Sequence, residues 1–281
     1  MSMGWRSLWA AGFVTPVLLL SSPALKAQHP VEKTDWSVET IRKSGQLVAP
    51  VFEGHYQNPD GTYTLVFGYH NLNTDEAIDV PLGPDNFIDP IEYDGMQPTH
   101  FDPVPKNGAR RHWGVVTVVV PEDFGDRQVV WNLRHRGHLW SIPGHLRSPH
   151  YLLDPFDTDA RDQHAGVMKF EPDGQGWRGR NGTVSEPLAA RVGQPVQLSI
   201  WLDPLPDPQN LVWWFKHQGP GDVMFNAWES VVPQSGGEAT TTATFSEPGE
   251  YMLRVKAVAN IATIEYHCCW TNGYIRVDVT E

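Results

Sequence analysis

Apolar and polar residues alternate with a period of two along the C-terminal part of the chain. Over residues 251–257, Tyr, Leu, Val and Ala alternate with Met, Arg and Lys, and residues 274–279 repeat the pattern with Arg276 and Asp278 at the polar positions. Successive side chains of a strand point to opposite faces, so this period is typical of half-buried antiparallel strands. The two segments therefore predict long strands that each turn one apolar face toward a core.

A turn joins the first of these strands to the one before it. Pro248 and Gly249 stand where a type II turn needs a preset φ and a positive φ. The run from Thr244 to Tyr251, followed by Leu253-Arg254-Val255, resembles the end of a polycystic-kidney-disease (PKD) or related immunoglobulin-like repeat. The resemblance covers roughly the final 90 residues and implies a β-sandwich. It implies little about function, because such sandwiches carry many roles.

Strand signals continue through the rest of the chain, with 25 glycines and 24 prolines marking the turns between them. We predict an all-β fold of two consecutive antiparallel immunoglobulin-like β-sandwich domains after an N-terminal signal or anchor segment. The predicted ranges are 1–27 for the signal, 46–156 for the first domain, 157–183 for a linker or long loop, and 184–281 for the second domain. The segment before residue 160, with Phe52-Glu53-Gly54 and then Asn58 to Tyr63, resembles uncharacterised secreted bacterial proteins.

The N-terminus has the features of a secretory signal peptide. Arg6 precedes an apolar run from Leu8 to Leu20, and Ala27 offers a small residue for cleavage. The run is shorter than the roughly 20 residues that cross a bilayer. We expect export to the periplasm or the outside of the cell, with an uncleaved anchor that tethers the protein to a membrane as the alternative.

The chain is acidic, with a formal net charge of −12. Cleavage after Ala27 would leave 19 basic and 33 acidic residues, a net charge of −14. Such a charge disfavours nucleic acid and anionic lipid as partners. It fits a soluble exported protein, and it also allows a cationic partner or a metal ion.

Two adjacent cysteines form the most unusual short motif, His267-Cys268-Cys269-Trp270. Neighbouring Cα atoms lie about 3.8 Å apart, closer than the usual range for a disulfide, so a bridge between the cysteines would be strained. Three interpretations stay open: a vicinal disulfide that turns the chain, two buried reduced thiols, or a soft-metal site with His267, most plausibly for Cu(I).

Four histidines fall within 16 residues, at positions 135, 138, 145 and 150. His135 and His138 are candidate zinc or copper ligands because His-x-x-His can converge at a turn. Arg134, Arg136 and Arg147 would repel a cation, so surface histidines are the competing interpretation. No other cofactor is expected, since the sequence has no dinucleotide fingerprint and no phosphate loop.

Trp213 and Trp214 are neighbours and cannot both face inward on a regular strand. One of them must be covered by the other domain or by a partner, or be exposed, where its ring could stack on a sugar. With Trp270 they are the candidate binding-surface residues.

Catalytic signatures are missing: the sequence has no Gly-x-Ser-x-Gly elbow and no His-Glu-x-x-His. We therefore expect a non-enzymatic exported protein that binds or scaffolds, docking on a protein partner in the envelope or as an accessory subunit of a membrane complex. The alternatives are a copper- or zinc-binding or thiol-redox protein that uses the His-Cys-Cys loop, and a polysaccharide-binding module.

Overall fold

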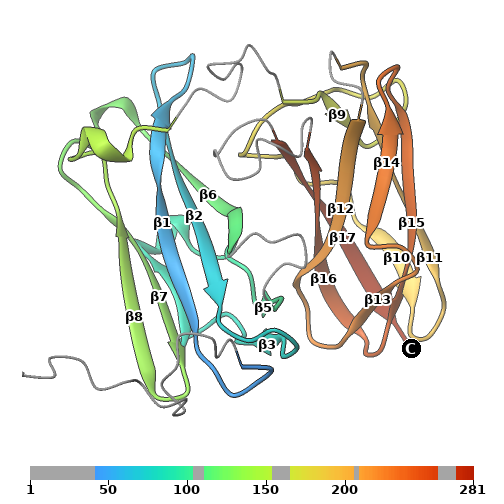
Figure 1. Cartoon of the computed structure of the whole chain (residues 1–281), viewed down its shortest axis with the longest axis horizontal. Helices are drawn as coiled ribbons and strands as arrows, with labels where there is room; N and C mark the ends of the chain where they lie inside the picture. Colours follow the sequence, from blue (N-terminus) through green and yellow to red (C-terminus); the bar gives the residue numbers. More distant parts are fainter. Residues whose placement is uncertain (1–41, 104–110, 154–164, 206–208, 259–269) are drawn as a thin grey trace, which may run out of the picture. The chain divides into compact units, whose positions relative to one another are not determined.

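Strands make up nearly all the regular structure in the computed structural model, which describes residues 42–103, 111–153, 165–205, 209–258 and 270–281. The predicted signal peptide lies outside these residues. The expectation of an all-β fold is confirmed, because the described part contains 17 strands and three short 3-10 helices (Figure 1).

The first β-sandwich has two three-stranded antiparallel sheets. One sheet has the order β1-β2-β6 and the other β4-β7-β8, with a two-stranded pair β3-β5 beside them. The bounds are β1 (Val48–Gln57), β2 (Tyr63–Asn71), β3 (Ile78–Asp79), β4 (Asn86–Asp89), β5 (His100–Phe101), β6 (His112–Val120), β7 (Val129–His135) and β8 (His138–Gly144). The helices are η1 (Ile91–Tyr93), η2 (Glu122–Phe124) and η3 (Pro149–Tyr151).

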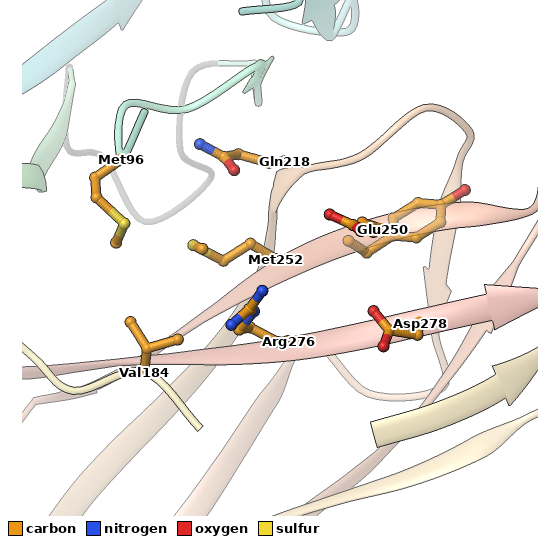
Figure 2. A pocket seen from close by; sticks show the side chains of 8 residues that line it. Met96, Val184, Gln218, Glu250, Met252, Arg276 and Asp278 are labelled. Atoms are coloured by element: carbon orange, nitrogen blue, oxygen red, sulfur yellow. The ribbon is translucent and has the colours of Figure 1, made fainter. Parts of the chain in front are cut away.

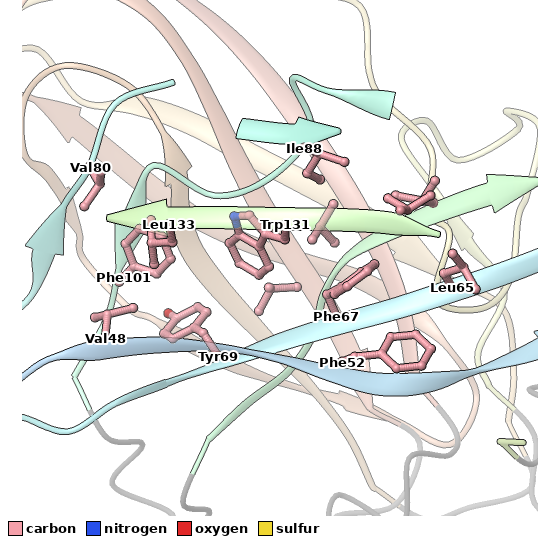
Figure 3. Packing of buried hydrophobic residues seen from close by; sticks show 14 of the residues in the cluster. Val48, Phe52, Leu65, Phe67, Tyr69, Val80, Ile88, Phe101, Trp131 and Leu133 are labelled. Atoms are coloured by element: carbon pink, nitrogen blue, oxygen red, sulfur yellow. The ribbon is translucent and has the colours of Figure 1, made fainter. Parts of the chain in front are cut away.

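Aromatic rings fill the space between these sheets (Figure 3). Trp131 is fully buried, and its ring centroid lies 6.3 Å from those of both Phe67 and Phe101. Asn86 is buried beside it and accepts a hydrogen bond from the Trp131 indole at 3.0 Å. The Asn86 amide donates to the carbonyls of Val80 and Pro98, so one polar side chain ties a strand to two loops inside the core.

The second sandwich has a five-stranded sheet of order β10-β17-β16-β12-β14 and a four-stranded sheet of order β13-β15-β11-β9. The bounds are β9 (Met168–Lys169), β10 (Leu188–Arg191), β11 (Val196–Leu202), β12 (Gln209–Gln218), β13 (Val223–Phe225), β14 (Glu229–Pro233), β15 (Gly237–Phe245), β16 (Gly249–Val258) and β17 (Trp270–Thr280). The turn between β15 and β16 falls where the sequence places it, and Gly249 has a φ of +146°.

Two features differ from the sequence-based expectation. The pairing of β10 with the last strand β17 is parallel, although all other pairings between numbered strands are antiparallel in the described part. Within the predicted linker 157–183, β9 pairs with β11, and Trp177 exchanges two main-chain hydrogen bonds with Met168. Strand β9 is therefore part of the four-stranded sheet, and Met168, Phe170 and Trp177 pack against the second core.

Both sandwiches belong to one compact unit, residues 41–281. In the described part of the chain, we find no helix with the length and apolar character needed to cross a membrane.

Replacing Asn86 by Ala should lower the free energy of unfolding by about 3 kcal/mol, because three buried polar groups would lose their partner. Urea denaturation at pH 7 measures this change. Gln57→Ala is the matched control, since the Gln57 side chain is exposed and makes one weak hydrogen bond to Gly61. An equal loss in both variants would contradict a special role for Asn86.

Candidate functional site

Part of the outer face of the five-stranded sheet is buried, although the polar alternation of β16 is typical of a half-exposed strand. Arg254 and Lys256 are 3% and 4% exposed, and Trp213 on neighbouring β12 is 5% exposed. Residues of the first sandwich cover this face, since the Arg254 guanidinium donates to the carbonyl of Gly114 at 3.1 Å. The two sandwiches therefore meet across a polar, desolvated surface, which we call the buried junction.

Gly114 on β6 lies at the centre of the buried junction. Its φ is +54°, and the register between β2 and β6 shifts at this point, which marks a β-bulge. Its carbonyl accepts hydrogen bonds from both Arg254 and Asn272, and its N–H donates to the Glu53 carboxyl at 3.0 Å. A Cβ at this position would lie 2.7 Å from the ring of Trp270, so only glycine fits.

Cations pack on the rings of the buried junction. The Lys256 ammonium lies 4.0 Å from the centroid of Trp270 and 5.9 Å from that of Trp213. The guanidinium of Arg180, from the stretch before β10, lies 5.1 Å from the Trp270 centroid and 5.2 Å from that of Tyr56. Ring faces attract cations, which offsets part of the cost of removing these charges from water.

Burial changes the acidity of the charged groups at the junction. It raises the pKa of Glu53 from 4.5 to about 7, although the positive charges of Arg111, Lys256 and Arg180 and the Gly114 N–H act in the opposite direction. Burial, together with the charge of Arg254, holds the pKa of Lys256 well below its usual value. Perturbed acids and amines mark functional sites as well as structural ion networks, so the geometry must decide between them.

A second polar network lies where β3 and β5 meet β12. His100 sits between two carboxylates, with its Nδ1 2.9 Å from Asp79 and its Nε2 3.4 Å from Asp102. Burial lowers the pKa of His100, but the hydrogen bonds and charges of the two aspartates outweigh it and raise the value to about 9. The Lys216 ammonium of β12 pairs with Asp79 at 3.0 Å, so this network also joins the two sandwiches.

Neutral side chains at the end of β12 hold the loop before β5. His217 is buried, its Nε2 lies 2.8 Å from the carbonyl of Met96, and burial lowers its pKa to about 3. The Gln218 amide donates to the carbonyls of Gly95 and Gln97. The loop is therefore fixed by hydrogen bonds that do not depend on pH near neutrality.

A pocket of about 480 Å³ opens beside that loop (Figure 2). Its lining residues are Met96, Val184, Gln218, Glu250, Tyr251, Met252, Arg276 and Asp278. Figure 2 shows Met252 and Arg276 on adjacent strands, with the Met252 side chain extending toward Met96. Glu53 and Lys256, the two groups of the junction with strongly changed pKa values, do not line this pocket.

The predicted metal ligands are only partly described. His267, Cys268 and Cys269 lie outside the described residues. His135 and His138 face each other across the two-residue turn between β7 and β8, where Arg136 and Gly137 both have positive φ. The His138 ring packs on Trp140, with centroids 4.3 Å apart. Within the described ranges, no group of three or more His, Cys, Asp or Glu residues is placed to hold a metal ion.

The three predicted binding-surface tryptophans are all buried. Trp214 packs in the core between the sheets of the second sandwich, and Trp213 and Trp270 pack together in the buried junction with Trp113 beside them. This corrects the alternative in which Trp213 or Trp214 is exposed, because the structure presents no open ring at these positions for a sugar. Trp213 is covered at the junction, where it packs with Trp270 of β17 and with Trp113 of β6 in the first sandwich.

Sequence reasoning missed Glu53, Gly114 and Arg180. One signal was present, since Glu53 directly follows the apolar run Val48–Phe52 within a predicted strand, where an acid is rarely buried without a partner. Nothing local marks Gly114 or Arg180, because their roles depend on which sheet face the other sandwich covers.

No protein-family model matches this chain, and no curated protein matches it. Solved structures show distant likeness. The PapD-like domain 7 of human CEP192 is 10% identical, with a TM-score of 0.28 over 49% of this chain and 94% of that one. The N-terminal domain of PorA is 13% identical, with a TM-score of 0.28 over 40% and 96%. WR4, a member of the MSP family from C. elegans, is 8% identical, with a TM-score of 0.27 over 33% and 92%.

These scores are too low to carry an argument about family or function. The fold of two β-sandwiches rests on the strand order and the two cores described above. The resemblances to PKD repeats and to secreted bacterial proteins stay expectations, without support from a family model.

Gly114→Ala should lower the free energy of unfolding by about 3 kcal/mol, combining the strain of a positive φ with overpacking against Trp270. Gly137→Ala is the matched control, because Gly137 has a φ of +75° but open space around it. The control should lose only about 1 kcal/mol. Thermal and urea unfolding would measure both, and equal losses would show that the contact with Trp270 has no energetic weight.

Glu53→Gln should change how stability depends on pH. A carboxyl whose pKa is higher in the folded state keeps its proton while the unfolded chain releases it, so stability falls as pH rises from 4.5 to about 7. The wild type should lose about 3 kcal/mol relative to Glu53→Gln across this window. Urea unfolding from pH 4 to pH 8 measures the difference, with the exposed Glu122→Gln as control. Parallel curves for wild type and Glu53→Gln would contradict the assignment.

Proposed function

We propose that this chain is a non-enzymatic, exported binding or scaffolding protein that docks on another protein in the cell envelope, or serves as an accessory subunit of a membrane complex. Export rests on the signal-like N-terminus, and docking rests on the surface of the second sandwich. The buried junction supports a scaffolding role, because Arg254, Asn272 and Lys216 fix the sandwiches to each other through hydrogen bonds and an ion pair.

The observation that carries the proposal is an exposed apolar edge. The edge segment, residues 223–233, contains β13 and β14 and passes from the four-stranded sheet to the five-stranded sheet. Met224, Trp228 and Val231 on this segment are 70%, 52% and 62% exposed. Large aromatic and apolar side chains held in water by a rigid framework are typical of protein interfaces, where Trp is enriched among the residues that dominate affinity.

The charges of the described residues support binding over catalysis. Glu53 and His217, whose pKa values are strongly changed, are buried and engaged with main-chain groups. Neither lines the 480 Å³ pocket, where a substrate could reach it. We therefore favour a protein that acts through its surface.

The test is affinity capture of the full chain from native membranes, comparing the wild type with Trp228→Ala. Removing an interface Trp should reduce recovery of a stoichiometric partner at least about tenfold. The main-chain carbonyl of residue 228 still bonds to Trp214, so the fold should persist. Ile91→Ala is the matched control, since Ile91 is 78% exposed on η1 of the first sandwich.

Recovery with Ile91→Ala should stay within about twofold of the wild type. The absence of any stoichiometric partner for the wild type would refute the proposal. Equal recovery with Trp228→Ala and the wild type would refute the assignment to the edge segment.

A further inference from the structure

We propose that the partner binds by strand addition: an extended, basic segment of another protein pairs with β14 and extends the five-stranded sheet by one strand. The inference rests on the proposed function and names its mode of recognition. It is carried by the main chain of β14, which has hydrogen-bonding groups available at the edge of the sheet.

Strand β14 ends the five-stranded sheet, and among the strands that the structure describes it pairs only with β12. The Trp214 N–H donates to the carbonyl of Trp228 at 2.9 Å. This bond shows which residues of β14 belong to hydrogen-bonded pairs with β12. Bonded and non-bonded pairs alternate in an antiparallel ladder, so residues 230 and 232 bond to β12. The N–H and C=O groups of Glu229 and Val231 then point away from the sheet.

These outward groups are available for pairing. Among the residues that the structure describes, no group forms a hydrogen bond with the outward main chain of Glu229 or Val231. An unpaired row of N–H and C=O groups at a sheet edge is a template for another strand. Main-chain pairing would supply the affinity, and the exposed Val231 and Trp228 would provide the apolar contacts on either side.

The usual protection of an edge strand is weak along β14. Natural edges are blocked by Lys, by Pro or by charges that project over the edge. Strand β14 has no Lys, and Pro233 removes an N–H only at its C-terminal end. The single acid, Glu229, is held on the sheet face because it accepts a hydrogen bond from the Trp213 indole at 2.7 Å. The N-terminal part of the edge is therefore open.

Charge and geometry favour a basic segment of a different protein over a second copy of this chain. The net charge of −12 attracts a basic segment and repels another copy. Antiparallel self-pairing centred on Val231 would also place Pro233 opposite Glu229 at both ends. Proline has no N–H, so the Glu229 carbonyl would stay unbonded in each copy.

The test uses two substitutions of one residue in the full chain. Val231→Pro removes the outward N–H and leaves the ladder to β12 intact, whereas Val231→Thr keeps both the N–H and the β-branched shape. Capture from native membranes should recover the partner about tenfold less with Val231→Pro and within about twofold with Val231→Thr. Urea unfolding of each purified variant establishes that it is folded.

A second measurement uses the wild-type protein and needs no variant. Hydrogen exchange of the Val231 amide, in the wild type with and without the captured partner, should slow at least about tenfold in the complex if a strand is added. Cross-linking from a photoreactive residue at position 224 then identifies the segment of the partner that lies against the edge.

The outcomes separate the inference from the proposed function. Strand addition is overturned if Val231→Pro and Val231→Thr recover the partner equally, or if the Val231 amide is not protected in the complex. The proposed docking still stands in that case if Trp228→Ala loses the partner. Cross-links to a second copy of this chain would overturn the claim that the added strand comes from a different protein. If the wild type recovers no partner, both proposals fall together.

Discussion

The burial of charged side chains at the buried junction is the constraint on which the rest of the structure depends. Arg254 and Lys256 alternate with core residues on β16, so the strand cannot bury its apolar face without presenting these two cations on the other. Covering that second face with another sandwich removes the cations from water, which is costly unless each finds a partner. The junction satisfies Arg254 with main-chain carbonyls and Lys256 with aromatic rings.

The bulge in β6 makes this arrangement possible. Strand β6 is the edge of its sheet, and at the bulge the positive φ of Gly114 accompanies a carbonyl that accepts hydrogen bonds from both Arg254 and Asn272. The absence of a side chain at Gly114 leaves the space that Trp270 occupies. The Glu53 carboxyl lies beside Gly114 because it accepts a hydrogen bond from the Gly114 N–H. Its pKa is raised because the carboxyl is buried there.

Two sandwiches fixed to each other by the buried junction form a rigid framework, which is compatible with the proposed binding of a partner at the protein surface. Polar side chains such as Arg254 and Lys216 join the two sandwiches, and Met224, Trp228 and Val231 are exposed on the edge segment of the second sandwich. In that segment the chain changes sheets between β13 and β14, which leaves main-chain groups at the edge and keeps Trp228 and Val231 in water. In the proposed function, binding would use the exposed residues of the edge segment, whereas the residues of the buried junction hold the two sandwiches together.

The sequence by itself determined the all-β class, the turn at Gly249 and the apolar face of each long strand, because a period of two and the φ requirement of a turn are local properties. It could not determine that Arg254, Lys256 and Trp213 are buried. An alternating pattern distinguishes the two faces of a strand, but it does not show whether another part of the protein covers the face opposite the core. It also did not connect Glu53 with Gly114, and it indicated a linker where Met168 forms part of a strand. Those outcomes were decided by the tertiary structure, because hydrogen bonds between residues more than 100 positions apart exist only once the two sandwiches have met.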